Sequence, residues 1–345
     1  MKSTDTRSQE ILDAVVRLNV ETGRPVSSGL VARALGRRYS SATVRTVMKR
    51  LEDDGLLVQP HTSAGRTPTD AGFREFVDHL QRGWPVVGWE PPRFLRQRVD
   101  ESLRATAGSH ELMKVLAGLL SQLTDNISIV LGPGWDTVRA QRVDLYPKEG
   151  GRILMVLVLE NAMVRTVLVA LPEAYPAVVV EAAGTILSER VAGRTVGDIR
   201  RGVLTSLEIS VGPAARCARE LIQRGRALFD ELEEGELELE GVERVLDQPE
   251  FSDPEPLKAL VRFIESPRSI RDALNQLDRQ TEGALGVWIG TENPLDSLRP
   301  FGLVLHRCEL DGRRAIMAVL GPRRMPYQRA FTGIDVLQRS LQGLS

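Results

Sequence analysis

The sequence lacks the features that mark several large classes of protein. Its 345 residues include two cysteines, Cys217 and Cys308, which lie in different regions without a CxxC spacing. Two isolated thiols exclude a disulfide scaffold and predict buried cysteines in a reducing compartment. The most apolar run, 153–159, is far shorter than the roughly 20 residues that span a membrane, and the N-terminus shows no apolar signal segment. We therefore expect a soluble, cytoplasmic protein with no membrane partner.

The chain also lacks a net charge of either sign. Its 45 Lys and Arg residues against 46 Asp and Glu residues give −1 at pH 7. This balance excludes a protein that coats nucleic acid indiscriminately, so any contact with DNA has to be local. At 42% hydrophobic and 26% charged residues, a chain of this length can form two or three packed domains.

The most informative absence is that of acidic residues between Thr22 and Leu51. The basic residues in that stretch are Arg24, Arg33, Arg37, Arg38, Arg45, Lys49 and Arg50, and acid returns at once with Glu52, Asp53 and Asp54. A basic block this local is the pattern expected of a nucleic-acid face.

The second half of the block predicts a DNA-reading helix. Ser40 or Ser41 can cap its start, and an apolar stripe follows at Val44, Val47, Met48 and Leu51. Hydroxyl and basic groups lie near the start or off the stripe, where they suit base edges and phosphates: Ser40, Ser41, Thr43, Arg45, Thr46, Lys49 and Arg50. An ordinary solvated amphipathic helix would show the same spacing.

The flanking segments predict a winged helix-turn-helix of about 80 residues. Two helices are expected upstream, at about 5–22 and 27–36, and Gly55 is expected to end the third. A short strand at 56–58, a polar loop at 60–67 and a helix opening at 68–70 then form the wing and its return. Further DNA contacts are expected from the loops, at Arg24, His61, Thr62, Ser63, Gly65 and Arg66. A metal site at His61 is not expected, because no Cys or second His lies nearby at ligand spacing.

The sequence after residue 83 predicts a sheet domain that is interrupted by a helical block. After a Gly-, Pro- and Trp-rich linker at 83–92, helices are expected at 93–104 and 109–124. Strands are then predicted at 127–131, 153–159 and 164–171, and again at 285–289, 303–308 and 315–320, before a final amphipathic helix at 327–341. Between them, strand signals vanish from about 195 to 282, where helices are predicted at 213–232, 257–264 and 270–277 and an acidic patch lies at 230–241. This pattern indicates an insertion.

No nucleophile–base spacing, catalytic carboxylate pair or metal cluster stands out, so we expect neither an enzyme nor a cofactor. Arg323 and Arg324 could bind an anion or hold the fold. We favour a turn in which both arginines have structural partners.

Two strings carry a family resemblance. SSATVRTVMKRLEDDGLL at 40–57 and PHTSAGRTPTDAGFREFVD at 60–78 resemble the signature of HrcA, the heat-inducible transcription repressors, and GVWIGTEN at 286–293 and GPRRMPY at 321–327 resemble that family's C-terminal pattern. The chain departs from the family pattern at Ser27, Gly29, Thr46, Thr67 and Phe73, where Gly, Arg, Asn, Ile and Tyr are usual.

The resemblance implies an α+β multidomain fold. It places a winged-helix DNA-binding domain at 1–84, a GAF-like sheet domain in two parts at 93–194 and 283–345, and a mainly helical inserted dimerising domain at 195–282. It also implies a homodimeric repressor of chaperonin and chaperone operons that binds their inverted-repeat operator, CIRCE. The chaperonin GroEL/GroES would help this repressor reach its active form, and misfolded proteins would occupy the chaperonin during heat shock.

Two other functions are compatible with parts of the sequence. One is a winged-helix regulator that responds to a small ligand in the GAF-like domain, held between the strands at 153–171. The other is an enzyme, or an enzyme's regulatory subunit, with an appended DNA module. The missing site pattern disfavours the second.

Overall fold

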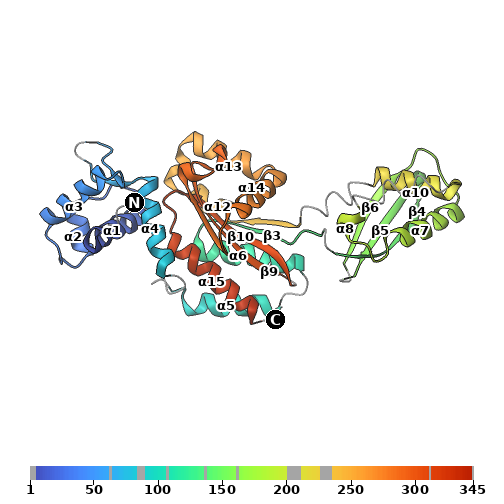
Figure 1. The fold of residues 1–345 in the computed structure, drawn as a ribbon, viewed down its shortest axis with the longest axis horizontal. Coiled ribbons are helices and arrows are strands. Elements are labelled where there is room, and N and C mark those ends of the chain that lie inside the picture. Colours follow the sequence, from blue (N-terminus) through green and yellow to red (C-terminus); the bar gives the residue numbers. More distant parts are fainter. Residues whose placement is uncertain are drawn as a thin grey trace. The chain divides into compact units, whose positions relative to one another are not determined.

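The computed structural model describes residues 5–61, 64–83, 90–105, 109–135, 138–160, 163–199, 211–225, 235–310 and 312–343. The protein is α+β, and the described strands form three antiparallel sheets (Figure 1). The chain divides into two compact units, one made of residues 1–132 and 237–345 and the other of residues 133–236.

The N-terminal elements have the predicted order. They are α1 (Thr6–Thr22), α2 (Ser28–Ala34), α3 (Ser41–Asp53), the antiparallel pair β1 (Leu57–Val58) and β2 (Thr67–Pro68), and α4 (Asp70–Gly83). Asp5 caps α1 by accepting from the Ser8 amide, and the left-handed Gly23 ends it. The predicted stripe of α3 is buried at Val44, Met48 and Leu51. Helices α1 and α2 pack on α3, and α4 packs on α1, so that their apolar faces share one core.

A five-stranded sheet forms the centre of the first unit, in the order β7-β3-β10-β9-β8. The strands are β3 (Ile127–Leu131), β7 (Leu237–Glu240), β8 (Leu285–Ile289), β9 (Phe301–Leu310) and β10 (Arg313–Pro322). Helices α6 (Ser109–Thr124) and α15 (Tyr327–Gln342) cover one face, with α5 (Arg93–Ala105) packed on them. Helices α13 (Pro254–Ile264) and α14 (Pro267–Gln280) cover the other face, next to the short α12 (Val242–Leu246).

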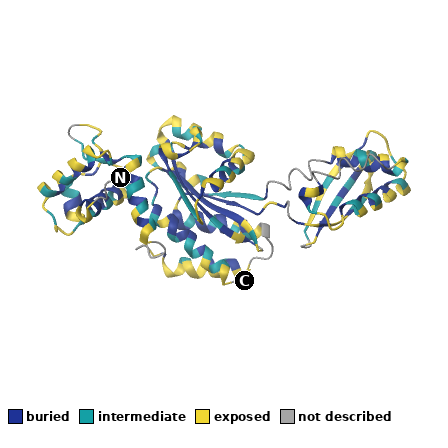
Figure 2. Cartoon of the chain, viewed as in Figure 1, coloured by how far each residue is buried: buried dark blue, intermediate teal, exposed yellow. Residues whose placement is uncertain are grey.

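Burial on both faces explains why the central strands are apolar at nearly every position. Val304 and Met317 pack towards α6 and α15, whereas Leu303 and Leu305 pack towards α13 and α14. Figure 2 shows these strands as a buried band, with exposed residues on the outer sides of the helices. The predicted strands at 285–289, 303–308 and 315–320 and the final helix are confirmed.

The second unit has a sheet of its own, made of β4 (Ala140–Lys148), β5 (Arg152–Leu159) and β6 (Val164–Ala170). Helices α7 (Ala177–Val191) and α10 (Pro213–Arg224) pack with it. The segments 153–159 and 164–171 are therefore strands as predicted, but they do not belong to the sheet that contains β3. One hypothesis placed a ligand pocket between these two strands. Such a pocket would belong to the β4-β5-β6 sheet and not to the central five-stranded sheet.

The division of the chain also differs from the expected insertion at 195–282. The interrupting unit is 133–236, and α13 and α14 are part of the first unit. The sequence analysis missed β7, because its acidic LELE segment was interpreted as a surface patch. In the structure Leu237 and Leu239 pack on the α13 side, and Glu238 and Glu240 alternate with them on this edge strand. Leu131 pairs with Leu237, so the chain leaves the sheet and returns to it at neighbouring positions.

The two cysteines are free and buried, in agreement with the sequence analysis. Burial raises the pKa of Cys217 to about 11 and that of Cys308 to about 12. Thiols with such pKa values stay protonated and unreactive at neutral pH.

The central sheet also buries a titratable side chain, His306 of β9, which is 1% exposed. Burial lowers its pKa to about 4 from the ordinary 6.5. Below the ordinary pKa the unfolded chain binds a proton that the folded chain does not, so the free energy of unfolding decreases as the pH falls from 6.5 towards 4. Above pH 6.5 this group has no effect.

We predict that lowering the pH from about 7.5 to about 5.5 costs about 1 kcal/mol of stability through His306 alone. Urea unfolding at the two pH values measures this cost, and His306→Gln should remove that part of the pH dependence. The control is His61→Gln, at an exposed histidine, which should keep it. An unchanged pH dependence in His306→Gln would contradict the assignment.

Candidate nucleic-acid interface

Helix α3 presents a polar face because its apolar stripe is fully used in packing. Arg45, Thr46, Lys49 and Arg50 are exposed, on the side opposite the buried Val44 and Met48. Ser40 caps the helix by accepting from the Thr43 amide at 3.1 Å. The Ser40 cap therefore defines where α3 begins, and the N-terminal half of the helix carries exposed hydrogen-bond donors, as a groove-binding helix needs.

The basic side chains on this face are available to a phosphate or a base edge. Among the described residues, no ion pair or hydrogen bond is recorded for the Arg45 guanidinium. The Lys49 Nζ lies 3.5 Å from Oδ1 of Asp53, and the Arg50 Nη1 lies 3.1 Å from Oδ2 of Asp5. These exposed pairs contribute about 0–1 kcal/mol each, so exchanging a carboxylate for a phosphate costs little.

The hydroxyl groups serve the local structure first. The Ser40 and Thr43 hydroxyls are 2.9 Å apart, and the Thr46 hydroxyl donates to the Ala42 carbonyl at 3.1 Å. The Ser41 hydroxyl lies 3.1 Å from that of Ser28 and joins the start of α3 to the start of α2. Each hydroxyl oxygen can still accept a further hydrogen bond.

The loop residues divide into two groups. Arg24, in the turn after α1, and His61, in the loop after β1, are exposed, and Thr62 and Ser63 lie outside the described residues. Gly65 and Arg66 lie against Val26, in the segment before α2. Arg66 exchanges both backbone hydrogen bonds with Val26, and a Cβ on Gly65 would overlap the Val26 backbone. Glycine is therefore required at this close approach.

The Arg66 side chain is committed as well. Its Nη2 lies 3.0 Å and its Nε 3.2 Å from Oε2 of Glu52, and only 13% of the side chain is exposed. The guanidinium attaches the loop to the end of α3, and a DNA contact by Arg66 stays a prediction. The first acidic residue after the basic block thus has a structural partner.

A second set of polar residues joins α4 to the central sheet domain. Asp70 accepts from the Thr291 amide at 3.0 Å, from the Thr291 hydroxyl at 3.1 Å and from Arg323 at 3.0 Å. Arg74, one turn later, donates to Glu292 and to the Val287 carbonyl, the latter at 2.7 Å. We call the set Asp70, Arg74, Thr291, Glu292 and Arg323 the α4 junction.

The α4 junction requires a glycine at position 290. Gly290 has φ +56°, and a Cβ there would overlap the Asp70 carboxylate. Burial alone lowers the pKa of Arg74, but hydrogen bonding and attraction from Glu292 outweigh it and the pKa is raised. The guanidinium therefore stays charged.

Arg324 makes a further tie to α1, donating to the Val20 carbonyl at 2.9 Å and to Glu250 at 2.8 Å. The preference for structural pairing of Arg323 and Arg324 is confirmed. The sequence analysis missed Asp70, Arg74 and Glu292. A signal for them was present in the strings that carry the family resemblance, because Asp70 and Arg74 lie in the string at 60–78 and Glu292 lies in the string at 286–293.

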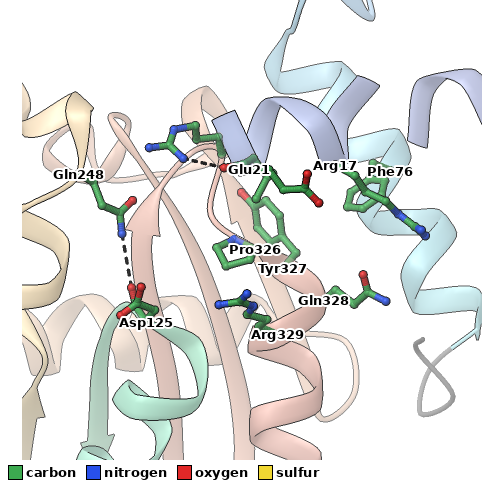
Figure 3. Close-up of a pocket in the computed structure, with 11 residues that line it drawn as sticks. Arg17, Glu21, Phe76, Asp125, Gln248, Pro326, Tyr327, Gln328 and Arg329 are labelled. Atoms are coloured by element: carbon green, nitrogen blue, oxygen red, sulfur yellow. Dashed lines mark hydrogen bonds between the residues drawn. The ribbon is translucent and has the colours of Figure 1, made fainter. Parts of the chain in front are cut away.

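A cavity of about 530 Å³ lies beside these contacts. Figure 3 shows it between the N-terminal helices and the start of α15, with Tyr327 and Arg329 reaching into it. Its walls include residues of both parts: Arg17, Glu21 and Phe76 from α1 and α4, and Asp125, Gln248 and Pro326 from the sheet domain.

Among the described residues, no group of three or more His, Cys, Asp and Glu side chains is placed to hold a metal ion. No helix in that part of the chain is long and apolar enough to cross a membrane.

Comparison with solved structures supports the fold. A crystal structure of a hypothetical protein superposes with a TM-score of 0.66 at 23% identity, covering 99% of this chain and 98% of that one. At this identity the similarity concerns the fold alone.

The sequence comparisons identify the family. The model of the HrcA protein C terminal domain matches residues 110–331. A heat-inducible transcription repressor HrcA from Desulforudis audaxviator is 31% identical over 342 residues, covering 98% of this chain and 96% of that protein. Another from Chlorobium phaeovibrioides is 29% identical, covering 97% and 96%. The chain belongs to the HrcA family.

Proposed function

We propose that the protein is a repressor of heat-shock genes, not an enzyme, and that it binds the CIRCE inverted repeat as a homodimer. The names of its relatives support a role in heat-inducible repression. The observation that carries the DNA contact is the exposed face of α3, where Arg45, Thr46 and Lys49 follow one another along one side. In this proposal residues 6–83 form a winged helix-turn-helix, and α3 enters the major groove.

The proposed DNA contacts are sorted by where their side chains lie. Arg45 and Thr46 read base edges, and Lys49, Arg50 and Arg24 contact phosphates. Ser40, Ser41 and Thr43 lie at the start of α3, where amides and hydroxyls suit a phosphate. His61, with its neighbours Thr62 and Ser63, contacts the flanking backbone, and Gly65 and Arg66 hold this loop in place.

The dimer contact is proposed on the inserted unit. Helices α7 and α10 cover one face of the β4-β5-β6 sheet, and no described element packs on the other. On that open face Tyr146, Leu154 and Leu168 form one cross-strand row. Tyr146 is 50% exposed, Leu168 49% and the neighbouring Val164 51%. An open apolar sheet face is a liability for an isolated unit, and a second copy of the same sheet would cover it. The central sheet domain is the GAF-like part in this proposal.

Regulation by the chaperonin GroEL/GroES is proposed from the family resemblance. The repressor reaches its active form with chaperonin help, and misfolded proteins compete for that help during heat shock.

A second candidate function is a regulator that responds to a small ligand. The cavity between the N-terminal helices and the start of α15 favours this function, because its volume of about 530 Å³ lies within the usual range for ligand sites. A saturable rise of Tm with one metabolite would support this candidate.

The first expected outcome is selective binding to the operator. Purified protein should bind a labelled CIRCE-type inverted repeat more tightly than a scrambled duplex at the same salt concentration, and chaperonin should increase the active fraction. Equal binding to both duplexes would remove the operator assignment. An active fraction that does not change with chaperonin would contradict the proposed regulation by the chaperonin.

The second prediction concerns Arg45. Arg45→Ala should weaken binding to the inverted repeat by ~1–3 kcal/mol and binding to the scrambled duplex by less, because a base-edge contact discriminates between sequences. Equilibrium titration of both duplexes measures the difference. Arg268→Ala, at an exposed arginine of α14, is the matched control and should bind as the wild type does. An equal loss on both duplexes would reduce Arg45 to a phosphate contact.

The third prediction tests the open sheet face. Leu168→Lys should lower the sedimentation mass from dimer to monomer, because it places a charge in the centre of the proposed contact. Val178→Lys is the matched control, since Val178 is 70% exposed on α7, which covers the opposite face. If Leu168→Lys stays dimeric, the contact lies elsewhere.

A further inference from the structure

Three segments that are far apart in the sequence meet at the α4 junction. Ile289, at the end of β8, pairs with Gly302, and Pro322, at the end of β10, pairs with Phe301. Both strands therefore end beside the start of β9, which brings residues 290–292 and 323–327 to the same end of the sheet. Asp70 and Arg74 lie four residues apart on α4, so both reach this end from one side of the helix.

The contacts of the α4 junction fix a direction as well as a position. Asp70 receives hydrogen bonds from a backbone amide, a hydroxyl and a guanidinium. Arg74 is held by the Glu292 carboxylate and the Val287 carbonyl. Glu292 is itself fixed, because it also accepts from the Ile289 amide at 2.9 Å. Bonds that converge from several directions on two side chains leave α4 little freedom to rotate.

Apolar packing also joins α4 to the central sheet domain, in a core that includes Phe73, Ile289 and Tyr327. The rings of Phe73 and Tyr327 lie 6.5 Å apart and make the aromatic contact between α4 and α15. Next to them the packing is interrupted by the cavity of about 530 Å³ (Figure 3). The polar contacts therefore add a directional restraint on the orientation of α4 beside this cavity.

We propose that Asp70, Arg74, Glu292 and Arg323 are positioning residues for operator recognition. They hold the DNA-reading helices at one orientation to the central sheet and thereby set the half-site spacing that a dimer accepts. Two recognition helices bind an inverted repeat tightly only when their separation matches the half-sites, because the second helix then binds at high effective concentration. This inference rests on the proposed function.

The first experiment measures orientation without DNA. Nitroxide labels attached through Ala34→Cys on α2 and Arg268→Cys on α14, both exposed positions, report the distance between the two parts by pulsed electron resonance. Labelled protein is diluted with unlabelled protein so that only distances within one chain contribute. The wild type should give one narrow distribution, and Arg74→Ala and Glu292→Gln should each broaden it.

The second experiment measures spacing. The inverted repeat is compared with versions lengthened by about 2 and about 5 base pairs, the latter being half a helical turn. The wild type should lose at least about tenfold in affinity on the lengthened repeats. Arg74→Ala and Glu292→Gln should bind a single half-site as the wild type does, bind the native repeat more weakly, and discriminate less between spacings.

Glu255→Gln is the matched control. It removes a carboxylate from an exposed pair, Glu255 with Lys258 at 3.1 Å, on α13. It should leave the distance distribution and the spacing preference unchanged. Circular dichroism and thermal unfolding identify any variant that fails to fold, and the conservative Asp70→Asn then replaces it.

The outcomes separate the two proposals. Narrow distributions in both junction variants, or an unchanged spacing preference, would overturn the positioning role. A wild type that binds the repeat no better than a scrambled duplex would remove the proposed function. In that event the distance distributions alone still decide whether the α4 junction holds the orientation.

Discussion

The central sheet is buried on both of its faces, and this burial determines where the surrounding helices pack. Strands β3, β9 and β10 carry apolar side chains at consecutive positions, so helices must cover both sides. Helices α6 and α15 cover one face, and α13 and α14 cover the other. The order of the strands then places the turn before α15 next to the end of β8. The residues that contact α4 are therefore brought together by the order of the strands in the sheet.

The same principle separates structure from recognition in the N-terminal elements. The apolar side of α3 is buried in the core at Val44, Met48 and Leu51. Basic and hydroxyl side chains therefore occupy the opposite, exposed side. Charged residues that appear equivalent in the sequence receive different roles. Arg45 faces solvent, whereas Arg66 is nearly buried against Glu52. The difference arises because the loop that carries Arg66 pairs with Val26, which brings its side chain over the end of α3.

The inserted unit shows how a sheet accommodates an interruption. Leu131 and Leu237 are paired, so the chain can leave and return without disturbing the strands on either side. The inserted sheet buries one face under α7 and α10, and its open face carries the apolar row that we assign to the dimer. In the proposed dimer, the contact with the second copy lies on a different unit from the proposed DNA-binding face of α3.

Most of the local elements could be predicted from the sequence. Helices α1, α3, α6 and α15 and strands β3, β8, β9 and β10 could be located from capping residues and apolar spacing, since these signals act over a few residues. The acid-free stretch and the α3 stripe likewise indicated the candidate DNA face. The three-dimensional fold was needed to show which strands share a sheet, where the insertion begins, that LELE is an edge strand, and that Asp70 and Arg74 join α4 to residues 287–292. These features depend on contacts between residues that are distant in the chain, more than 200 positions apart for those of α4, and no local pattern records such contacts.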